Sequence, residues 1–300
     1  MKPDHTPWLH RYAILLAVST LLLVVAGASV TSNEAGLAVP DWPLSYGQVM
    51  PEMTGGIFYE HGHRMIATTV GFLTIIMAVW LWRADDRSWM RKLGWAALGA
   101  VIAQGVLGGM TVIFMLPKPV SIGHACLAQL FFSTTVAIAL FTSREWKRGP
   151  QPVDDNGRIR SLAVVAPLAV LAQLALGASY RHKALGLVPH VIGAAIVTTL
   201  VLWLVWQVLA DYPRHRALRQ SSLTLAAAVL AQVFLGIAAY MSRVATADAP
   251  QPLPLMVSFT VMHVAVGALT MAASVVFGIQ ILRNVTRPDS LSLASITAAS

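Results

Sequence analysis

Long apolar stretches separated by charged residues dominate this chain. Eight stretches contain no Asp, Glu, Lys or Arg, and each has at least 18 residues: 12–33, 65–82, 93–117, 119–143, 161–180, 184–210, 220–242 and 249–282. A helix of about 20 apolar residues crosses the hydrocarbon core of a membrane. The pattern therefore predicts an all-α membrane protein with eight transmembrane helices.

Composition and charge placement support this prediction. Hydrophobic residues make up 56% of the chain and charged residues 11%, whereas a soluble domain has about 25% charged residues. The net charge is +8, but only five of the 21 Lys and Arg residues lie in alternate connections between the stretches: Arg64, Lys118, Arg181, Lys183 and Arg243. The positive-inside rule then places both termini in the cytoplasm. The basic charge reports topology, and the expected partner is the lipid bilayer and not nucleic acid.

The first stretch resembles a secretory signal peptide only superficially. Its apolar run is longer than the usual signal core, and the eleven residues before it are too few for an organelle transit peptide. We therefore expect a multi-pass protein of a bacterial plasma membrane. The single cysteine, Cys126, excludes an intramolecular disulfide and a cysteine-built metal site.

The chain repeats a short motif. Ala-Gln-x-x-Leu-Gly occurs at 103–108, 172–177 and 231–236, and Gly27-Ala28-Ser29 is a weaker copy that matches 177–179. These copies predict two pseudo-symmetric four-helix bundles, 1–150 and 151–300, with a polar tail after about 284. The glutamines are interpreted as interhelical hydrogen-bonding groups, and Gly105, Gly108 and Gly109 as a tight helix crossing.

Four of the nine histidines share one position in the pattern. His63, His124, His190 and His263 each lie near the start of an even-numbered span, so all four are predicted at the outer membrane face. The remaining five are expected to be solvated: His5, His10, His61, His182 and His215. Ionisable groups inside a membrane are costly and usually functional, although each histidine alone would suit a simple interhelical hydrogen bond.

Paired imidazoles at equal depth favour haem ligation. Neutral imidazole is a common axial ligand of haem iron, and cofactor sites form between facing helices of a bundle. The repeat pairs His63 with His124, and His190 with His263. Zinc is disfavoured because nothing supplies further ligands to each pair. Small neighbours give room for a flat macrocycle or simply allow close helix packing: Gly123, Ala125, Gly193, Ala194, Ala265 and Gly267.

Only the first half has an acidic residue beside its histidine. In Glu60-His61-Gly62-His63-Arg64, Glu60 lies one helical turn before His63 on the same face. A carboxylate at a haem edge moves protons or stabilises positive charge. Arg64, Arg181 and Lys183 are candidate contacts to haem propionates. The alternative is that these charged groups reach the membrane interface and contact water.

These features resemble the heme A synthase family. The resemblance spans the eight stretches and their four histidines. Its most specific matches are Glu60-x-x-His63-Arg64 and the segment Gly-Ala-Ser-Val-Thr at 27–31, followed by Gly36-Leu37 and Asp41-Trp42-Pro43. Many family members carry a cysteine pair in an outer loop. This chain lacks that pair, and any thiol-dependent step of those relatives is therefore not expected here.

The resemblance implies a specific activity and specific roles. It implies oxidation of a heme O methyl group to the formyl group of heme A for terminal oxidase assembly. His190 and His263 would ligate a heme b cofactor, His63 and His124 would flank the substrate heme O, and Glu60 would be the catalytic carboxylate. A heme O-supplying enzyme and oxidase assembly factors are the implied partners, and the electron partner is left open.

Two other functions fit the same histidines. A two-haem membrane cytochrome would pass electrons from a quinol-like donor and leave both haems unaltered. A haem carrier or chaperone would bind haem without any reaction. Identification of the haem extracted from the protein separates these three alternatives.

Overall fold

The computed structural model is almost entirely helical and describes residues 6–155 and 159–286. Eight helices have the length and the apolar composition to cross a membrane, with the short α6 continuing into α7 as one of them. The elements are α1 (Thr6–Ser32), α2 (Gly55–Ala84), α3 (Ser88–Ile113), α4 (Lys118–Thr142), α5 (Arg144–Lys147), β1 (Val153–Asp154), α6 (Ile159–Leu162), α7 (Val165–Arg181), α8 (Leu187–Asp211), α9 (Arg216–Ala245), α10 (Pro254–Asn284) and β2 (Val285–Thr286).

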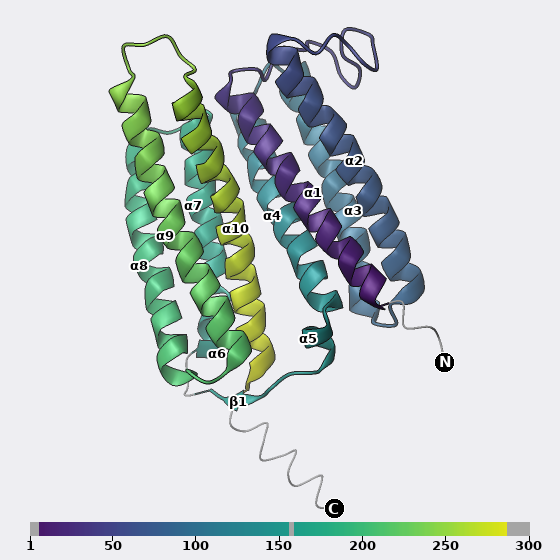
Figure 1. The fold of residues 1–300 in the computed structure, drawn as a ribbon, viewed down its shortest axis with the longest axis vertical. Coiled ribbons are helices and arrows are strands. Elements are labelled where there is room, and N and C mark those ends of the chain that lie inside the picture. The colour runs from purple at the N-terminus through teal and green to yellow at the C-terminus, as the bar shows by residue number, and fades with distance from the viewer. Residues whose placement is uncertain (1–5, 156–158, 287–300) are drawn as a thin grey trace, which may run out of the picture.

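The long helices form two side-by-side groups, α1–α4 and α7–α10 (Figure 1). In each group the main contacts link consecutive helices and then the last helix with the first. The even-numbered members of this cycle, α2 and α4 in one group and α8 and α10 in the other, therefore lie across a diagonal. Helices suit this environment because their backbone polar groups are satisfied within the element, as a lipid surrounding requires. The twofold relation between the groups stays a prediction.

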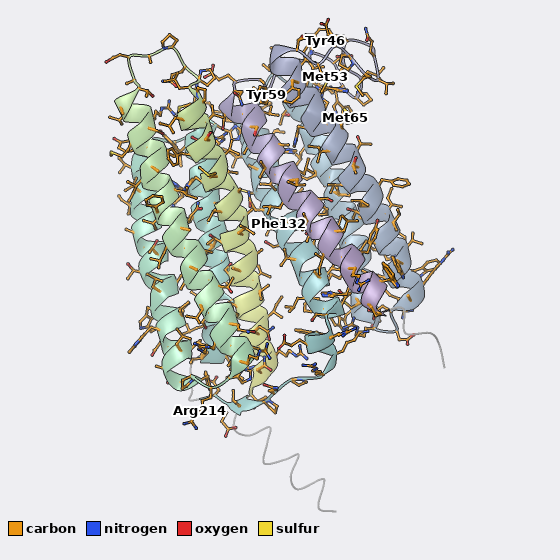
Figure 2. All side chains as sticks on the ribbon, viewed as in Figure 1. Tyr46, Met53, Tyr59, Met65, Phe132 and Arg214 are labelled. Carbon is orange, nitrogen blue, oxygen red and sulfur yellow. The ribbon has the colours of Figure 1, made fainter. Side chains whose placement is uncertain are left out.

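The two groups meet along α1, α4, α7 and α10. Val24, Phe132, Ala268 and Ala272 form a buried apolar cluster at this boundary, and Phe132 lies between the groups in Figure 2. Small residues on α10 let its backbone come close to α1 and α4. The arrangement brings the C-terminal end of α7 beside the C-terminal end of α1.

The connection between the groups is attached to the end of α10. β1 pairs in parallel with β2, and the backbone N–H of Gln151 donates to the side chain of Asn284 at 2.9 Å. The chain directly after α10 is thus ordered through Thr286, while the predicted polar tail falls mainly on 287–300, outside the described residues. This connection lies at the lower end in Figure 1, together with the start of α1 and the end of α10.

The loop between α1 and α2, residues 33–54, folds back over the upper end of its own group (Figure 1). Gly109 of α3 makes this close approach possible, because a Cβ at this position would lie 2.8 Å from the ring of Trp42. The hydroxyl of Tyr46 donates to the backbone oxygen of Ala38 at 2.7 Å. This loop is the part of the fold that lies next to the candidate site.

Candidate functional site

One contact recurs in all four pairs of consecutive helices. The imidazole of each predicted ligand lies against a glycine of the preceding long helix. A Cβ added to that glycine would approach the ring Cε1 to 3.0 Å for Gly27 with His63, 3.3 Å for Gly108 with His124, 2.9 Å for Gly177 with His190 and 3.0 Å for Gly236 with His263. A side chain at these positions would displace the ring. We call these four glycines, Gly27, Gly108, Gly177 and Gly236, the glycine seats of the histidines.

The seats explain the sequence repeat better than helix crossing does. The terminal glycine of Ala-Gln-x-x-Leu-Gly is the seat in α3, α7 and α9, and Gly27 is its counterpart in α1. The prediction that Gly105, Gly108 and Gly109 mark a helix crossing is wrong. Gly108 receives His124 and Gly109 receives Trp42, while a Cβ at Gly105 would meet nothing within 4 Å.

His190 of α8 and His263 of α10 face each other across their group. Their ring centroids are 6.3 Å apart and the ring planes are perpendicular. A metal–imidazole bond is roughly 2.0–2.1 Å and the nitrogen lies roughly 1.2 Å from its ring centre, so two imidazoles on opposite sides of one metal have centroids roughly 6.4 Å apart. The centroid spacing is therefore that of two imidazoles sharing one metal, while the amide nitrogen of Gln232 lies 3.2 Å from Nε2 of His263 in this structure.

The other pair, His63 of α2 and His124 of α4, has a different environment. The Nδ1 atoms of both rings are buried and make no hydrogen bond of normal geometry among the described residues, although the backbone of Leu23 lies near the ring of His63 and that of Gln104 near the ring of His124. Among the described residues, the rings of His63 and His124 do not form a close ring contact of the kind that His190 and His263 form. Buried polar atoms without partners are rare and indicate a ligand, water or function.

The small residues after His190 and His263 do not provide room for a macrocycle. A Cβ on Gly193 would collide with the side-chain oxygen of Gln173, and a Cβ on Gly267 would lie 3.3 Å from the amide nitrogen of Gln232. Glutamine side chains therefore occupy this space. At these two positions the glycines therefore contact glutamine side chains of a neighbouring helix, as ordinary helix packing would give.

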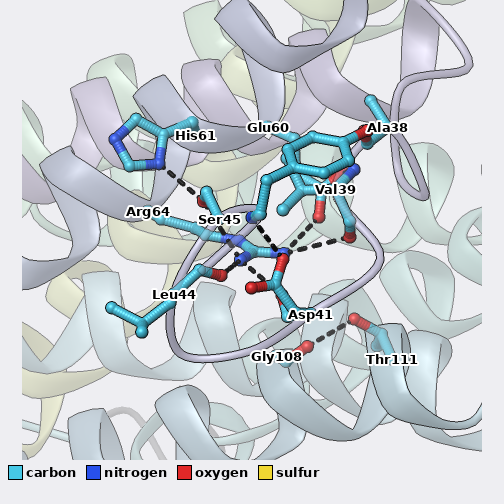
Figure 3. A network of polar contacts seen from close by, with 11 residues as sticks. Ala38, Val39, Asp41, Leu44, Ser45, Glu60, His61, Arg64, Gly108 and Thr111 are labelled. Atoms are coloured by element: carbon cyan, nitrogen blue, oxygen red, sulfur yellow. Dashed lines mark hydrogen bonds and ion pairs between the residues drawn. The ribbon is translucent and has the colours of Figure 1, made fainter. Parts of the chain in front are cut away.

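Glu60 and Arg64 form an ion pair of 2.6 Å on α2. Glu60 is 4% exposed, and its second oxygen accepts the backbone N–H of Val39 at 2.9 Å. Arg64 donates to the backbone oxygens of Asp41 and Leu44 at 2.7 and 2.8 Å. Figure 3 shows the guanidinium inside the folded loop. The charged pair predicted beside the haem thus also holds the loop 33–54 in place.

The histidine next to Glu60 is part of the same network. The Nδ1 atom of His61 lies 2.8 Å from the hydroxyl of Ser45, and the residue is 6% exposed. The prediction that His61 is solvated is wrong, because the folded loop covers it. Two others are half-buried and bonded: His10 lies 3.3 Å from Thr142 Oγ1, and His215 accepts the N–H of Leu218 at the start of α9. His5 lies outside the described residues.

The turn of the loop is ordered by Asp41. Its carboxylate accepts the backbone N–H groups of Gly47 and Tyr46 at 2.8 and 2.7 Å. These bonds, with that of Gly47 the strongest influence, hold the pKa of Asp41 below its ordinary value of 3.8. The ionised carboxylate therefore stabilises the loop that contacts Glu60 and His61.

Arg181, at the outer end of α7, links the two groups of helices. Its Nη2 donates to the backbone oxygen of Ala28 at 2.9 Å and to the hydroxyl of Ser32 at 2.7 Å, both in α1. The neighbouring His182 is half-buried, and this burial, with the charge of Arg181, holds its pKa below the ordinary value. Lys183 is exposed. Of the three predicted propionate contacts, Arg181 is therefore the one that bonds across the two groups of helices among the described residues.

The fold and the site together define a polytopic membrane protein with two pairs of histidines seated at one end of two helix groups. Comparisons with known proteins agree with the family resemblance seen in the sequence. A family model described as cytochrome oxidase assembly protein matches residues 53–190, a range that contains Glu60, His63, Arg64, His124 and His190.

Three relatives give the extent of the similarity. The heme A synthase of Symbiobacterium thermophilum is 30% identical over 220 residues, which are 62% of this chain and 71% of that protein. That of Halalkalibacterium halodurans is 24% identical over 75% of this chain and 85% of that protein. That of Shouchella clausii is 32% identical, but the match spans only 44% of its length. The chain belongs to the heme A synthase family.

Proposed function

We propose that this protein oxidises a methyl group of heme O to the formyl group of heme A in a bacterial plasma membrane. The single observation that carries the proposal is the pair of unequal histidine sites within a member of this family. One pair already has the spacing for a fixed haem, and the other has buried ring nitrogens that make no hydrogen bond of normal geometry, beside an acidic network. The product would serve terminal oxidase assembly.

His190 and His263 would hold a resident heme b. Their 6.3 Å spacing supports this assignment, as do the glycine seats that fix both rings. Neutral imidazoles from facing helices are suitable axial ligands. When bound, heme b would supply electron transfer.

His63 and His124 would flank the substrate heme O, and Glu60 would be the catalytic carboxylate. Glu60 lies one turn before His63 on α2 and is buried. It accepts one hydrogen bond at each oxygen, and a carboxylate has about four acceptor sites. It therefore keeps the capacity to take a proton or to stabilise positive charge at the haem edge.

Arg181 is the best-supported propionate contact. Its bonds to Ala28 and Ser32 use only Nη2, and a guanidinium has further N–H groups that match a carboxylate. In Arg64, by contrast, both terminal nitrogens already bind Glu60 and the loop. We infer that Arg64 chiefly positions Glu60, and that Lys183 contributes positive charge at the surface.

The proposed topology places both termini and the 144–160 connection in the cytoplasm, and the four histidines at the outer face. The support is the distribution of Lys and Arg. The two groups of helices are proposed to be related halves, 1–150 and 151–300, for the substrate haem and the cofactor. A heme O-supplying enzyme and oxidase assembly factors are the proposed partners.

The test is expression of the chain in bacterial cells that make heme O but lack their own heme A synthase. Extracted haems are separated by chromatography and identified by mass. The proposal predicts heme A, with a vector-only strain as control. Bound haem without any heme A would contradict the proposal and favour the two-haem cytochrome. Binding of added haem without heme A or redox activity would favour the carrier.

A further inference from the structure

The loop 33–54 exposes apolar side chains at its surface. Six of its large hydrophobic residues are exposed: Leu37, Trp42, Leu44, Tyr46, Val49 and Met50. Val49 is 81% exposed and Met50 is 59% exposed. The connection between α9 and α10, residues 246–253, lies at the same end of the molecule and exposes no large hydrophobic residue. Clustered apolar surface outside the core marks contact with a protein or a membrane.

The chain at the end of this loop forms a defined turn. The backbone groups of the two outer residues of Ser45–Gln48 exchange hydrogen bonds of 3.0 Å in both directions. Tyr46 and Gly47, the two central residues, both have positive φ, 54° and 70°. This is the tight two-residue turn that joins two antiparallel arms. We call residues 44–50 the loop tip, and its shape displays Val49 directly after the turn.

The height of the loop tip matches the headgroup layer of a bilayer. α2 has 30 residues and is therefore about 45 Å long, while a bilayer with its headgroups is about 40–45 Å thick. The first turns of α2 then lie among the headgroups. In Figure 1 the loop reaches sideways past the upper end of α2 at the height of these turns, and Figure 2 labels Tyr46 in this part of the loop. The loop tip thus extends over the surrounding lipid.

The composition of the loop favours apolar contact with lipid over attraction between charges. Residues 33–54 contain Glu34, Asp41 and Glu52 but no Lys or Arg, and basic residues are those that anionic headgroups attract. Tyrosine prefers the boundary between headgroups and hydrocarbon. The hydroxyl of Tyr46 already donates to a backbone oxygen within the loop at 2.7 Å. Its ring can therefore enter the boundary without leaving a polar atom unpaired.

We propose that the loop tip inserts at the headgroup boundary of the adjacent leaflet, and that this contact with lipid helps to hold the outer loop in place. The same loop bonds Glu60 through the backbone of Val39 and His61 through the side chain of Ser45. The membrane then fixes one side of the loop while the polar network on α2 fixes the other. This inference goes beyond the proposed function and is independent of it, because contact with lipid is measured without any haem reaction.

The first test measures the depth of the loop tip with spin labels. The full-length protein, with its bound haem, is reconstituted in vesicles of phosphatidylethanolamine and phosphatidylglycerol. Cys126→Ala removes the native thiol and gives the unlabelled blank. Val49→Cys adds the reporter and Ala247→Cys the control; both positions are exposed, so neither change disturbs packing. Electron paramagnetic resonance then compares access to oxygen, which concentrates in lipid, with access to a water-soluble nickel chelate.

The label at position 49 should be reached by oxygen more readily than by the nickel chelate, and the label at position 247 should show the opposite preference. Because apolar contact carries the binding, the preference at 49 should persist in high salt, which screens charge, and in vesicles of phosphatidylcholine alone. Access to the chelate as high at 49 as at 247 would overturn the inference. So would low access to both reagents with magnetic broadening that grows with protein concentration, since a second copy of the chain would then cover the loop tip.

A second measurement tests whether lipid holds the loop. Val49→Asp places a charge on the loop tip, and Ala247→Asp is the matched control. Burial of a side chain as large as valine shifts an equilibrium by about 10-fold or more, and proteolysis follows the population of the open form. Cleavage within 41–54 by a neutral protease should be about 10-fold faster in vesicles of Val49→Asp, and unchanged in the control. Cleavage of Val49→Asp at the wild-type rate would overturn the holding role.

Discussion

Gly177 lies directly against the imidazole of His190, and a Cβ at position 177 would come within 2.9 Å of the ring. Gly236 has the same relationship to His263, with a distance of 3.0 Å. Because real side chains do not approach so closely, either the ring or the helix must move if the glycine is replaced. The position of each ligand is therefore determined partly by the helix that precedes it.

Gly177→Ala and Gly236→Ala should reduce bound haem strongly. Overpacking of this kind costs about 1–3 kcal/mol, and here the cost falls on the orientation of the ligand. Haem per protein and the low-spin absorbance spectrum are the measurements. Gly105→Ala is the control, since a Cβ there meets nothing within 4 Å. Wild-type haem content in the Gly177 and Gly236 variants would contradict the seat interpretation.

Glu60→Gln should retain haem but lose most heme A production. The glutamine oxygen can still accept the N–H of Val39, so the loop should stay largely in place while the charge is lost. Removal of one positioned electrostatic group costs on the order of 100- to 1000-fold in rate. Heme A is assayed in membranes with expression matched by immunoblot.

Ser45→Ala is the matched control for the loop, because it removes the bond to His61 and leaves the Glu60 side chain unchanged. It should lower heme A formation far less than Glu60→Gln does. Equal losses in the two variants would assign Glu60 to loop anchoring alone.

The outer loop should become sensitive to protease only in strong acid. The pKa of Asp41 is lower in the folded loop than its ordinary value of 3.8. Its bonds therefore stabilise the loop above about pH 3.8, and the contribution is lost as the pH falls through the lowered pKa. Cleavage within 41–54 by an acid-active protease is followed as a function of pH.

Within the working range of the acid-active protease, Asp41→Asn should be cleaved faster than the wild type above about pH 4 and should show a weaker rise as the pH falls further. Glu52→Gln, at an exposed acidic residue of the same loop, should follow the wild-type profile. The role of Asp41 would be refuted if its variant and the wild type gave the same curve.

The proposed topology makes a prediction at three positions. Reporter fusions after residue 50 and after residue 250 should be extracytoplasmic, and one after residue 155 should be cytoplasmic, because most Lys and Arg residues lie on one side. Paired reporters active only on opposite sides of the membrane provide the control. A cytoplasmic signal at 50 or 250 would contradict the shared outer location of the four histidines.

Eight helices were predictable because charge is costly in lipid and marks the ends of spans. Ending each helix at the nearest charged residue, however, predicted helices that are too short. α1 begins at Thr6 and includes Arg11, and α9 continues through Arg243 to Ala245, because long basic side chains at helix ends reach the interface. The connection between α9 and α10 is therefore confined to 246–253.

The register of the four histidines was readable from sequence, but their immediate surroundings were not. The pattern of apolar and charged residues could not show that the loop 33–54 folds back and buries His61. That burial depends on the contact of Trp42 with Gly109, which are far apart in the sequence. The contacts of Gln173 and Gln232 with the histidines could have been predicted from the repeated sequence motif. The repeated motif ends in the glycine seat and precedes a histidine helix each time.

The most direct test of the account is the identity of the haem lost from each histidine pair. The protein is purified from cells that make both heme b and heme O, and its haems are extracted and identified for single alanine variants of all four histidines. His190→Ala and His263→Ala should lose heme b, while His63→Ala and His124→Ala should keep heme b and lose heme O and heme A. Loss of heme b from the His63 and His124 variants, with its retention in the His190 and His263 variants, would contradict the assignment of the two sites.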